Sequence, residues 1–287
     1  MQETIQSFTD YLQTEKKASK NTEVSYQRDL RKLAVFLKEH GIEKPEQMNA
    51  TVLNSYLLYL EREHFSPATI SRSIAAIHMF CQYACQEGKM VSDPSKALQP
   101  PRVERKMPEI LSIAEVDLLL RQPKTDTPKG IRDKAMLEML YATGIRVSEL
   151  QYITIEAVKC GEAVVNCKSK TRSVFIIKKL KQKLLRYAAK QGIKSGMIFV
   201  TKSGKPINRT NIWREMKSLC KDANVNSQKV FPHNLRHLFA RTFYGIEKDI
   251  AKLADILGHS SIDTTRIYII STGTEHRRRM ENMHLII

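Results

Sequence analysis

A cluster of histidine, arginine and tyrosine residues lies in the last fifth of the chain. Its members are His233, Arg236, His237, His259 and Tyr268. An arginine can donate two hydrogen bonds to phosphate oxygens, and a histidine can transfer protons near neutral pH. A tyrosine hydroxyl can attack phosphorus and form a covalent intermediate. Together these residue types predict chemistry on a phosphodiester, and that chemistry requires no metal ion.

Metal-dependent and serine-dependent sites fit this cluster poorly. His233 and His237 stand four residues apart, a spacing found for metal ligands, but H-N-L-R-H lacks the glutamate of the H-E-x-x-H motif and places an arginine between the rings. Nearby acidic residues are scattered, and the sequence has neither a G-x-x-x-x-G-K-[ST] loop nor a G-x-S-x-G turn. We therefore expect no metal and no cofactor. Packing or surface histidines remain the alternative interpretation of the pair.

The charge of the chain is concentrated in its second part. The 287 residues carry a formal net charge of +17, with 42% hydrophobic and 27% charged residues, as in ordinary globular proteins. Residues 1–100 contain 12 Lys+Arg and 12 Asp+Glu, whereas residues 101–287 contain 35 and 18. A basic region of this kind favours binding to a polyanion such as nucleic acid. A solvated face or a membrane-surface patch is the alternative.

Membrane and secreted classes find no support in the sequence. No apolar run approaches the ~20 residues of a membrane span, and residues 1–20 lack the apolar core and cleavage site of a secretory signal. The five cysteines are too few and too irregularly spaced for a disulfide framework or a C-x-x-C zinc site, so we expect free, buried thiols. The protein is expected to be cytoplasmic, without membrane insertion.

The elements that must position the cluster begin with a helical N-terminal domain. Apolar residues at helical spacing predict four helices before residue 90. They span about 2–17, 21–41, 50–64 and 67–88. Ser19 or Asn21 offers a cap for the second, and Ser66-Pro67 opens the fourth. The pattern predicts a four-helix domain over residues 1–99.

A charged segment flanked by prolines separates this domain from the rest. Residues 100–108 read P-P-R-V-E-R-K-M-P, and proline favours extended backbone, so we interpret the segment as an interdomain linker. The second domain covers residues 109–287. It opens with a predicted capping box from Ser112 to Glu115.

Arg146 follows the next predicted helix of this domain. That helix runs from about Lys129 and ends at Gly144, and another helix is predicted over residues 145–150, which places Arg146 at a helix junction. Taken alone, Arg146 fits a surface arginine paired with Glu149 equally well.

A change of period then indicates a hairpin. Residues 162–177 are rich in β-branched and aromatic side chains on both sides of a polar segment, Lys168–Arg172, which predicts two strands joined by a basic, exposed tip. Helices resume at about 178–191, at 209–223 and from His233. The chain is therefore predicted to be mainly α with a small β-sheet, in two domains.

Three separated segments follow one another along the chain: A-T-G-I-R-V-S-E-L at 142–150, H-N-L-R-H at 233–237, and L-G-H-S-S-I at 257–262 with T-T and Y after it. They resemble the signature of the tyrosine recombinase (phage integrase) family, and the chain is most similar to its Xer branch. The resemblance covers nearly the whole chain in order. It implies an N-terminal four-helix core-binding domain and a C-terminal mixed α/β catalytic domain.

The resemblance also implies roles for single residues. Catalytic residues are Arg146, Lys168, His233, Arg236, His259 and Tyr268, with Glu149 in support to orient the arginine and histidine side chains. Arg146 and Arg236 would bind the non-bridging oxygens of the scissile phosphate and offset charge in the transition state. His233 would act in proton transfer, and His259 would hydrogen-bond the phosphate. Tyr268 would attack phosphorus, leaving a 3′-phosphotyrosine and a free 5′-hydroxyl.

The hairpin lysine is ambiguous. In the family, a lysine on the β-hairpin protonates the leaving hydroxyl, but the tip here is one residue shorter than the usual G-K-G-x-K pattern. Counting forward from the first strand favours Lys168, and counting back from Arg172 favours Lys170. We expect Lys168 and keep Lys170 as the alternative.

The resemblance implies a site-specific DNA recombinase that exchanges strands through a Holliday junction. Its expected partners are double-stranded DNA with paired inverted recombinase-binding arms and three further protomers, in a homotetramer or in a heterotetramer with a paralogous recombinase. The C-terminal tail would contact a neighbouring protomer, and packing on its own domain is the alternative. Both chromosome dimer resolution and mobile-element integration or excision remain open, because the tail and Ile269-Ile270 depart from the usual Xer ending.

Two other functions use the same residues differently. A type IB topoisomerase-like enzyme would form the same phosphotyrosine without exchanging partners. A catalytically silent DNA-binding regulator would keep the fold without cleavage, although the full set of candidate catalytic residues argues against it.

Overall fold

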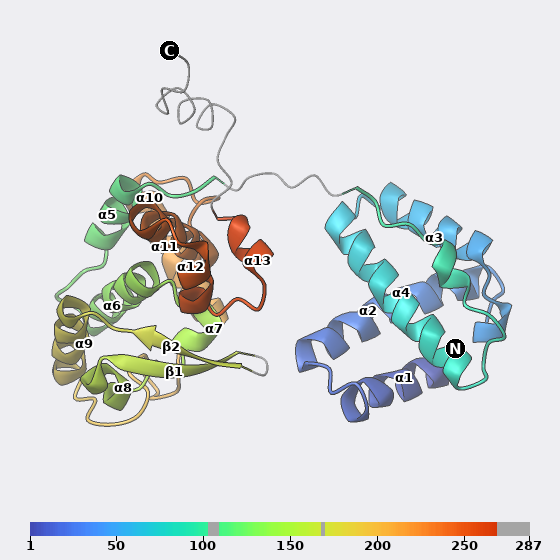
Figure 1. The fold of residues 1–287 in the computed structure, drawn as a ribbon, viewed down its shortest axis with the longest axis horizontal. Helices are drawn as coiled ribbons and strands as arrows, with labels where there is room; N and C mark the ends of the chain where they lie inside the picture. Colours follow the sequence, from blue (N-terminus) through green and yellow to red (C-terminus); the bar gives the residue numbers. More distant parts are fainter. Residues whose placement is uncertain (103–108, 168–169, 269–287) are drawn as a thin grey trace, which may run out of the picture. The chain divides into compact units, whose positions relative to one another are not determined.

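The computed structural model describes residues 1–102, 109–167 and 170–268 of the chain (Figure 1). The chain divides into two compact units, Met1–Met107 and Pro108–Ile287. Each unit has a hydrophobic core of its own. Among the described residues, no helix is both long enough and apolar enough to cross a membrane.

The N-terminal unit contains the four helices that the apolar spacing predicts. They are α1 (Gln2–Thr14), α2 (Lys20–Glu39), α3 (Ala50–Arg62) and α4 (Pro67–Gln86), with short 3-10 turns η1 (Pro45–Gln47) and η2 (Pro94–Ala97). Ser19 caps α2 and Ser66 caps α4, each accepting a bond from the backbone N–H three residues on. Arg72 on α4 forms two hydrogen bonds with buried Asp29 on α2, at 2.8 and 3.0 Å. The caps stabilise the start of each helix, and the Arg72–Asp29 ion pair joins the two long helices.

The C-terminal unit is built from helices around one β-hairpin. Its elements are α5 (Ile113–Arg121), α6 (Pro128–Thr143), α7 (Val147–Leu150), α8 (Ile155–Cys160), β1 (Glu162–Cys167), β2 (Lys170–Phe175), α9 (Lys178–Lys190), α10 (Arg209–Ala223), α11 (Pro232–Glu247), α12 (Ile250–Leu257) and α13 (Ile262–Arg266). Helix α6 packs between α9 and α11, and α12 packs against α11, α13 and β2 (Figure 1). The elements that carry the catalytic candidates, α7, α11, α12 and the hairpin, therefore converge within this unit.

The hairpin has one buried and one exposed face. Its strands are antiparallel, and their register runs from Glu162 opposite Phe175 to Cys167 opposite Lys170. The alternating side chains of Ala163, Val165 and Val174 are buried, whereas Val164 and Phe175 are exposed. Helix α12 lies against β2, so the end of α12 is next to the hairpin.

Two expectations from the sequence are wrong. Arg172 was expected in the exposed tip, but β2 begins at Lys170, and strand alternation places Arg172 on the buried face with Val174. The cysteines were expected to be buried, but Cys160 is exposed because it lies at the end of the short helix α8, next to the turn at Gly161. A smaller difference concerns α7, which begins at Val147 rather than at residue 145.

Several expectations concern residues outside the described part of the chain. They include most of the linker (103–108), Lys168 with its neighbour in the tip (168–169), and the C-terminal tail (269–287).

Candidate active site

Arg146 is positioned by the turn between α6 and α7. Gly144 ends α6 in the left-handed conformation, with φ of 59°, and Arg146 follows in extended backbone as the N-cap of α7. Nη1 of Arg146 donates to Oε1 of Glu149 at 2.9 Å, and its backbone N–H donates to Oε2 at 2.9 Å. Nη2 donates to the carbonyl oxygen of Gly258 at 3.1 Å. The pair with Glu149 thus forms inside a site rather than on an isolated surface.

Arg236 lies almost fully buried on α11. It is 2% exposed, and it donates to the carbonyl oxygens of Gly144 and Leu257, at 2.6 Å in both cases. Burial, followed by the charge of Arg146, lowers the pKa of Arg236 to about 10. The guanidinium is therefore still charged at neutral pH, in surroundings with little water.

Arg172 is a third guanidinium at the same place, and the sequence reading did not assign it to the site. Nη2 lies 2.6 Å from Oε2 of Glu149, and Nη1 donates to the carbonyl oxygen of Ile256 at 2.6 Å. The alternation of side chains along the strand could have predicted the burial of Arg172. Arg172 stands two positions before Val174, and residues two apart in a strand lie on the same face. The lysines around it gave the segment the composition of an exposed tip.

The three arginines share the C-terminal end of α12. Three consecutive carbonyl oxygens, those of Ile256, Leu257 and Gly258, each accept from a different arginine. The last carbonyls of a helix have no partner within the helix and carry partial negative charge, so cations are favourable there. Guanidinium groups from the start of α7, from β2 and from α11 therefore lie close together at the C-terminal end of α12.

His259 follows this helix end and is neutral at pH 7. Burial, and then the charges of Arg236 and Arg146, lower its pKa to about 4. Its Nε2 lies 3.0 Å from Nη2 of Arg236, and its Nδ1 lies 2.7 Å from Oγ1 of Thr265. Because an arginine can only donate, Nε2 must accept, and the proton is assigned to Nδ1.

Tyr268 lies among three histidines. It is 5% exposed, and its ring centroid is 4.4 Å from that of His237, 5.6 Å from that of His259 and 6.2 Å from that of His233. The tyrosine is also close enough to Arg236 to oppose the lowering of that arginine's pKa. The structure thus brings the candidate nucleophile, proton carriers and phosphate ligands together within one unit.

The remaining histidines differ in exposure. His233 is open to solvent on one side, and its pKa is lowered by partial burial of the ring and then by the charges of Arg236 and Arg146. His237 is buried, and burial followed by the charge of His233 lowers its pKa to about 4. Its Nδ1 has no hydrogen-bond partner within the described ranges. Of the pair, His233 is the one that solvent and substrate can reach.

Metal ligands and the hairpin lysine are the remaining candidates. Within residues 1–102, 109–167 and 170–268, no group of three or more His, Cys, Asp or Glu residues is placed to hold a metal ion. The carboxylate at the site, Glu149, is already bound by Arg146 and Arg172. Lys168 lies outside the described residues, and Lys170 is the first residue of β2.

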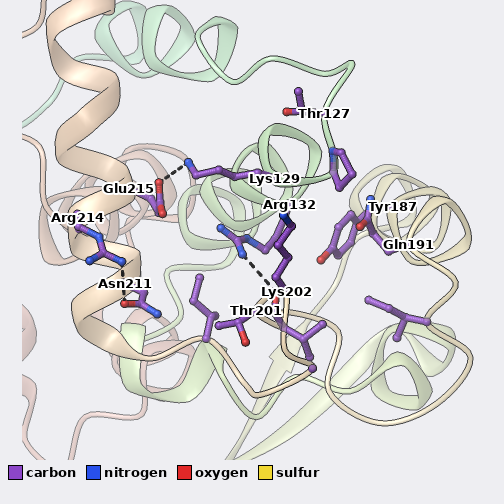
Figure 2. Close-up of a pocket in the computed structure, with 15 residues that line it drawn as sticks. Thr127, Lys129, Arg132, Tyr187, Gln191, Thr201, Lys202, Asn211, Arg214 and Glu215 are labelled. Atoms are coloured by element: carbon purple, nitrogen blue, oxygen red, sulfur yellow. Dashed lines mark hydrogen bonds and ion pairs between the residues drawn. The ribbon is translucent and has the colours of Figure 1, made fainter.

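A separate cavity of about 730 Å³ lies in the same unit. It is lined by the N-terminal part of α6, the C-terminal end of α9 and the N-terminal part of α10. Figure 2 shows Lys129 directed at Glu215 and Arg132 directed at the backbone near Thr201. Asp133 pairs with both of these cations, at 2.8 and 2.9 Å. Because Lys129 and Arg132 are both paired with carboxylates, we interpret the cavity as a polar contact region between helices rather than as a second reaction centre.

Both units match family models. The model described as the phage integrase family matches residues 109–275, and the model described as the phage integrase N-terminal SAM-like domain matches residues 5–88.

Curated relatives are similar over nearly the whole chain. The chain is 33% identical to the tyrosine recombinase XerC of Herpetosiphon aurantiacus, covering 93% of this chain and 90% of the relative. It is also 33% identical to the tyrosine recombinase XerD of Oceanobacillus iheyensis, covering 98% of this chain and 97% of the relative.

Solved structures share the fold. A post-cleavage complex of the XerH site-specific recombinase bound to palindromic difH substrate has a TM-score of 0.76 at 20% identity, over 94% of this chain and 81% of that one. A lambda integrase dimer bound to a COC′ core site has a TM-score of 0.77 at 15% identity, over 95% and 96%.

Proposed function

The chain belongs to the phage integrase family of tyrosine recombinases, which break and rejoin DNA, and we propose that it does so through a 3′-phosphotyrosine formed by Tyr268. The observation that carries this assignment is the burial of the Tyr268 ring against His233, His237 and His259, beside Arg236. A tyrosine that only packed in the core would not need three histidines and an arginine around it.

We propose a cleavage step that uses these residues together with a hairpin lysine. The scissile phosphate binds between Arg146 and Arg236, whose charges offset the negative charge that grows at phosphorus. The hydroxyl oxygen of Tyr268 attacks phosphorus while the bond to the 5′-oxygen breaks, and His233 accepts the tyrosine proton. A hairpin lysine, Lys168 with Lys170 as the alternative, gives its proton to the departing 5′-oxygen. The phosphotyrosine conserves the ester, so resealing needs no nucleotide cofactor.

His259 changes its hydrogen bonding when phosphate binds. In the structure its Nε2 accepts from Arg236. A phosphate oxygen is a stronger acceptor for that guanidinium, and its negative charge favours the protonated form of His259. His259 then becomes a donor to the phosphate, with Nδ1 still bound to Thr265.

Strand exchange requires more than one protomer. We propose double-stranded DNA with paired inverted binding arms as the substrate, and a tetramer on two synapsed sites, either homotetrameric or formed with a paralogous recombinase. The basic residues 101–287 suit the DNA backbone. Residues 1–99 would act as the core-binding domain, 100–108 as the linker, and the tail within 109–287 as a protomer contact. Action on DNA also suggests a cytoplasmic location.

The biological role has two forms. Chromosome dimer resolution and mobile-element integration or excision use the same chemistry, and the 33% identity to both a XerC and a XerD assigns the chain to neither. The genomic position of the target site distinguishes them, because a replication terminus indicates the first role and element ends indicate the second.

Trapping covalent DNA tests the proposed function. Protein recovered from cells under denaturing conditions should carry DNA whose sequence gives paired arms around a short spacer, and Tyr268→Phe should carry none. A nicked duplex of the recovered site should then accumulate covalent protein. Recombinant products from two such sites on a supercoiled plasmid would distinguish a recombinase from a topoisomerase. Wild-type protein that yields no covalent DNA on its bound sites would instead indicate a silent regulator.

A further inference from the structure

Arg172 is a buried arginine at the site with no part in the cleavage step described above. Its side chain is 6% exposed. Nη2 and Nη1 each make a short hydrogen bond, to Glu149 and to the carbonyl oxygen of Ile256. Its Nε has no hydrogen-bond partner in the described part of the chain. The two Nη contacts therefore determine where the guanidinium lies.

Burial of this third positive charge is electrostatically costly. Arg172 is among the charges that lower the pKa of both Arg236 and His259. An apolar side chain of similar length would fill the same space without this repulsion. Packing alone therefore does not explain why an arginine stands at this position. The explanation must lie in the groups that its guanidinium binds.

The first of these groups is Glu149. Its Oε1 accepts from Nη1 of Arg146, and its Oε2 accepts both from the backbone N–H of Arg146 and from Nη2 of Arg172. The carboxylate is thus held between two guanidiniums, one facing the proposed phosphate position and one buried behind it. Loss of Arg172 removes the charged donor that fixes Oε2, and with it the fixed direction of the Arg146 side chain.

The second group is the end of α12. Gly258 has φ of 64°, and a Cβ added there would lie 2.2 Å from Cδ of Arg172, so the helix end closes directly over the aliphatic part of this side chain. The same stretch supplies carbonyl acceptors to Arg236 and Arg146. A displaced Arg172 therefore displaces the acceptors of both other arginines.

We propose that Arg172 is a positioning residue for DNA cleavage, which holds Glu149 and the end of α12 together and so orients Arg146 and Arg236 toward the scissile phosphate. In this role Arg172 acts through Glu149 and the end of α12 rather than on the phosphate itself. Because it lies on β2, it also joins the hairpin that carries the general acid to the phosphate ligands. The proposal rests on the phosphate-binding role proposed for Arg146 and Arg236.

The first test compares three variants in single-turnover cleavage of the nicked site at saturating protein. Arg172→Met should slow covalent-complex formation about 100-fold, the scale seen when one transition-state donor is lost, while DNA affinity changes less than about threefold. Arg172→Lys should fall between Arg172→Met and wild type, because an ammonium can keep one of the two contacts. Arg132→Met is the matched control, since Arg132 is also mostly buried, pairs with Asp133 and donates to a carbonyl oxygen, but lies outside the site. Its cleavage rate should stay within about twofold of wild type at 25 °C even if its melting temperature falls.

A second readout separates positioning from a general structural defect. A methylphosphonate at the scissile position removes one charged non-bridging oxygen, so the reaction depends less on well-placed arginines. The deficit of Arg172→Met should shrink at least about tenfold on this substrate, whereas a general structural defect would slow both substrates equally. In a Glu149→Gln background, Arg172→Met should add less than about threefold, because its route to Arg146 is already broken.

The outcomes are distinguishable. Wild-type cleavage rates for Arg172→Met, or the same deficit on the normal and the methylphosphonate substrate, would overturn the positioning role and leave the phosphotyrosine mechanism standing. Absence of any covalent complex with wild-type protein would instead refute the proposed function itself. If Arg172→Met does not fold, the same two-substrate comparison is made with Arg172→Lys, and an equal deficit on both substrates again overturns the proposal.

Discussion

Two histidine rings at this site, those of His237 and His259, are kept neutral at pH 7 by their surroundings. Both His237 and His259 have a pKa near 4, lowered by burial before any charge is considered. A neutral ring can accept a proton or a hydrogen bond, and it adds nothing to the repulsion among three guanidiniums. In the proposed mechanism the incoming phosphate is the first partner that favours a protonated ring, so His259 would gain its charge together with the substrate.

These low pKa values predict a pH dependence of stability. An unfolded histidine titrates near 6.5, so between about pH 6.5 and 4 the unfolded chain binds more protons than the folded one. Stability should therefore be constant above about pH 6.5 and fall as the pH is lowered toward 4, by roughly 1–3 kcal/mol for each histidine after allowance for partial exposure. Urea unfolding at a series of pH values measures this fall.

Variants identify the groups responsible. His237→Gln should reduce the slope of stability against pH in this window. His64→Asn serves as the control because His64 is exposed in the N-terminal unit, and asparagine tolerates its positive φ of 58°. Equal slopes for wild type and His237→Gln would show that the buried ring does not contribute.

Individual residues of the site were predictable to the extent that motifs carry them. Arg146, His233, Arg236, His259 and Tyr268 stand in segments whose spacing indicates the family, and the structure places all five together. Arg172 stands in none of these segments. Its burial depends on the register of β2 against β1, which is fixed by pairing across the hairpin rather than by the local lysine-rich sequence.

At the level of elements, the end of α12 packs closely against the hairpin. Gly258 adopts a left-handed conformation there and lies against Arg172. Gly258→Ala should destabilise the protein by roughly 3 kcal/mol, from backbone strain plus displacement of an arginine held at both Nη atoms. Gly192→Ala is the matched control, because Gly192 has φ of 66° and open space around it. It should cost only about 1 kcal/mol.

Chemical unfolding of the two glycine variants provides the measurement. The difference between them isolates the contact with Arg172 from the strain that both share. If Gly258→Ala and Gly192→Ala lose the same stability, the close approach of α12 to Arg172 contributes nothing and the helix end can move freely.

Helix positions were largely predictable because caps and apolar spacing agree. The capping box from Ser112 to Glu115 and the Gly144 terminus both form as expected. The observed helix boundaries differ from the predicted ones where tertiary contacts determine the backbone conformation. Helix α7 starts at Val147 because Arg146 takes extended backbone to serve as its N-cap, with Glu149 bonding back to it. The spacing of apolar residues in the sequence does not reveal this bond from the backbone N–H of Arg146 to the Glu149 carboxylate.

At the scale of the whole chain, charge is unevenly divided between the two parts. All of the net +17 lies in residues 101–287. Binding to a duplex should therefore weaken steeply with salt, with a slope of about −0.9 in log affinity against log salt for each phosphate neutralised. Residues 109–287 expressed alone should retain most of the slope of the full chain, and residues 1–102 should show a shallow one. Titrations between about 50 and 300 mM salt measure these slopes, and a steeper slope for residues 1–102 would contradict the prediction.

The division of charge favoured a polyanion partner, and DNA was predicted only together with the motif residues; the target sequence could not be predicted from either. Backbone charge contacts carry no base information, and base contacts depend on side-chain positions relative to a groove. Those positions are a property of the complex rather than of the chain.

The hydroxyl of Thr265 has a consequence for the order of events at the site. It holds Nδ1 of His259, and the backbone N–H of Tyr268 donates to the carbonyl oxygen of the same threonine. The segment from Thr265 to Tyr268 therefore carries both the proposed nucleophile and the hydroxyl that anchors His259. We expect any displacement of this segment to take Tyr268 out of the site and to release Nδ1 of His259 in the same motion.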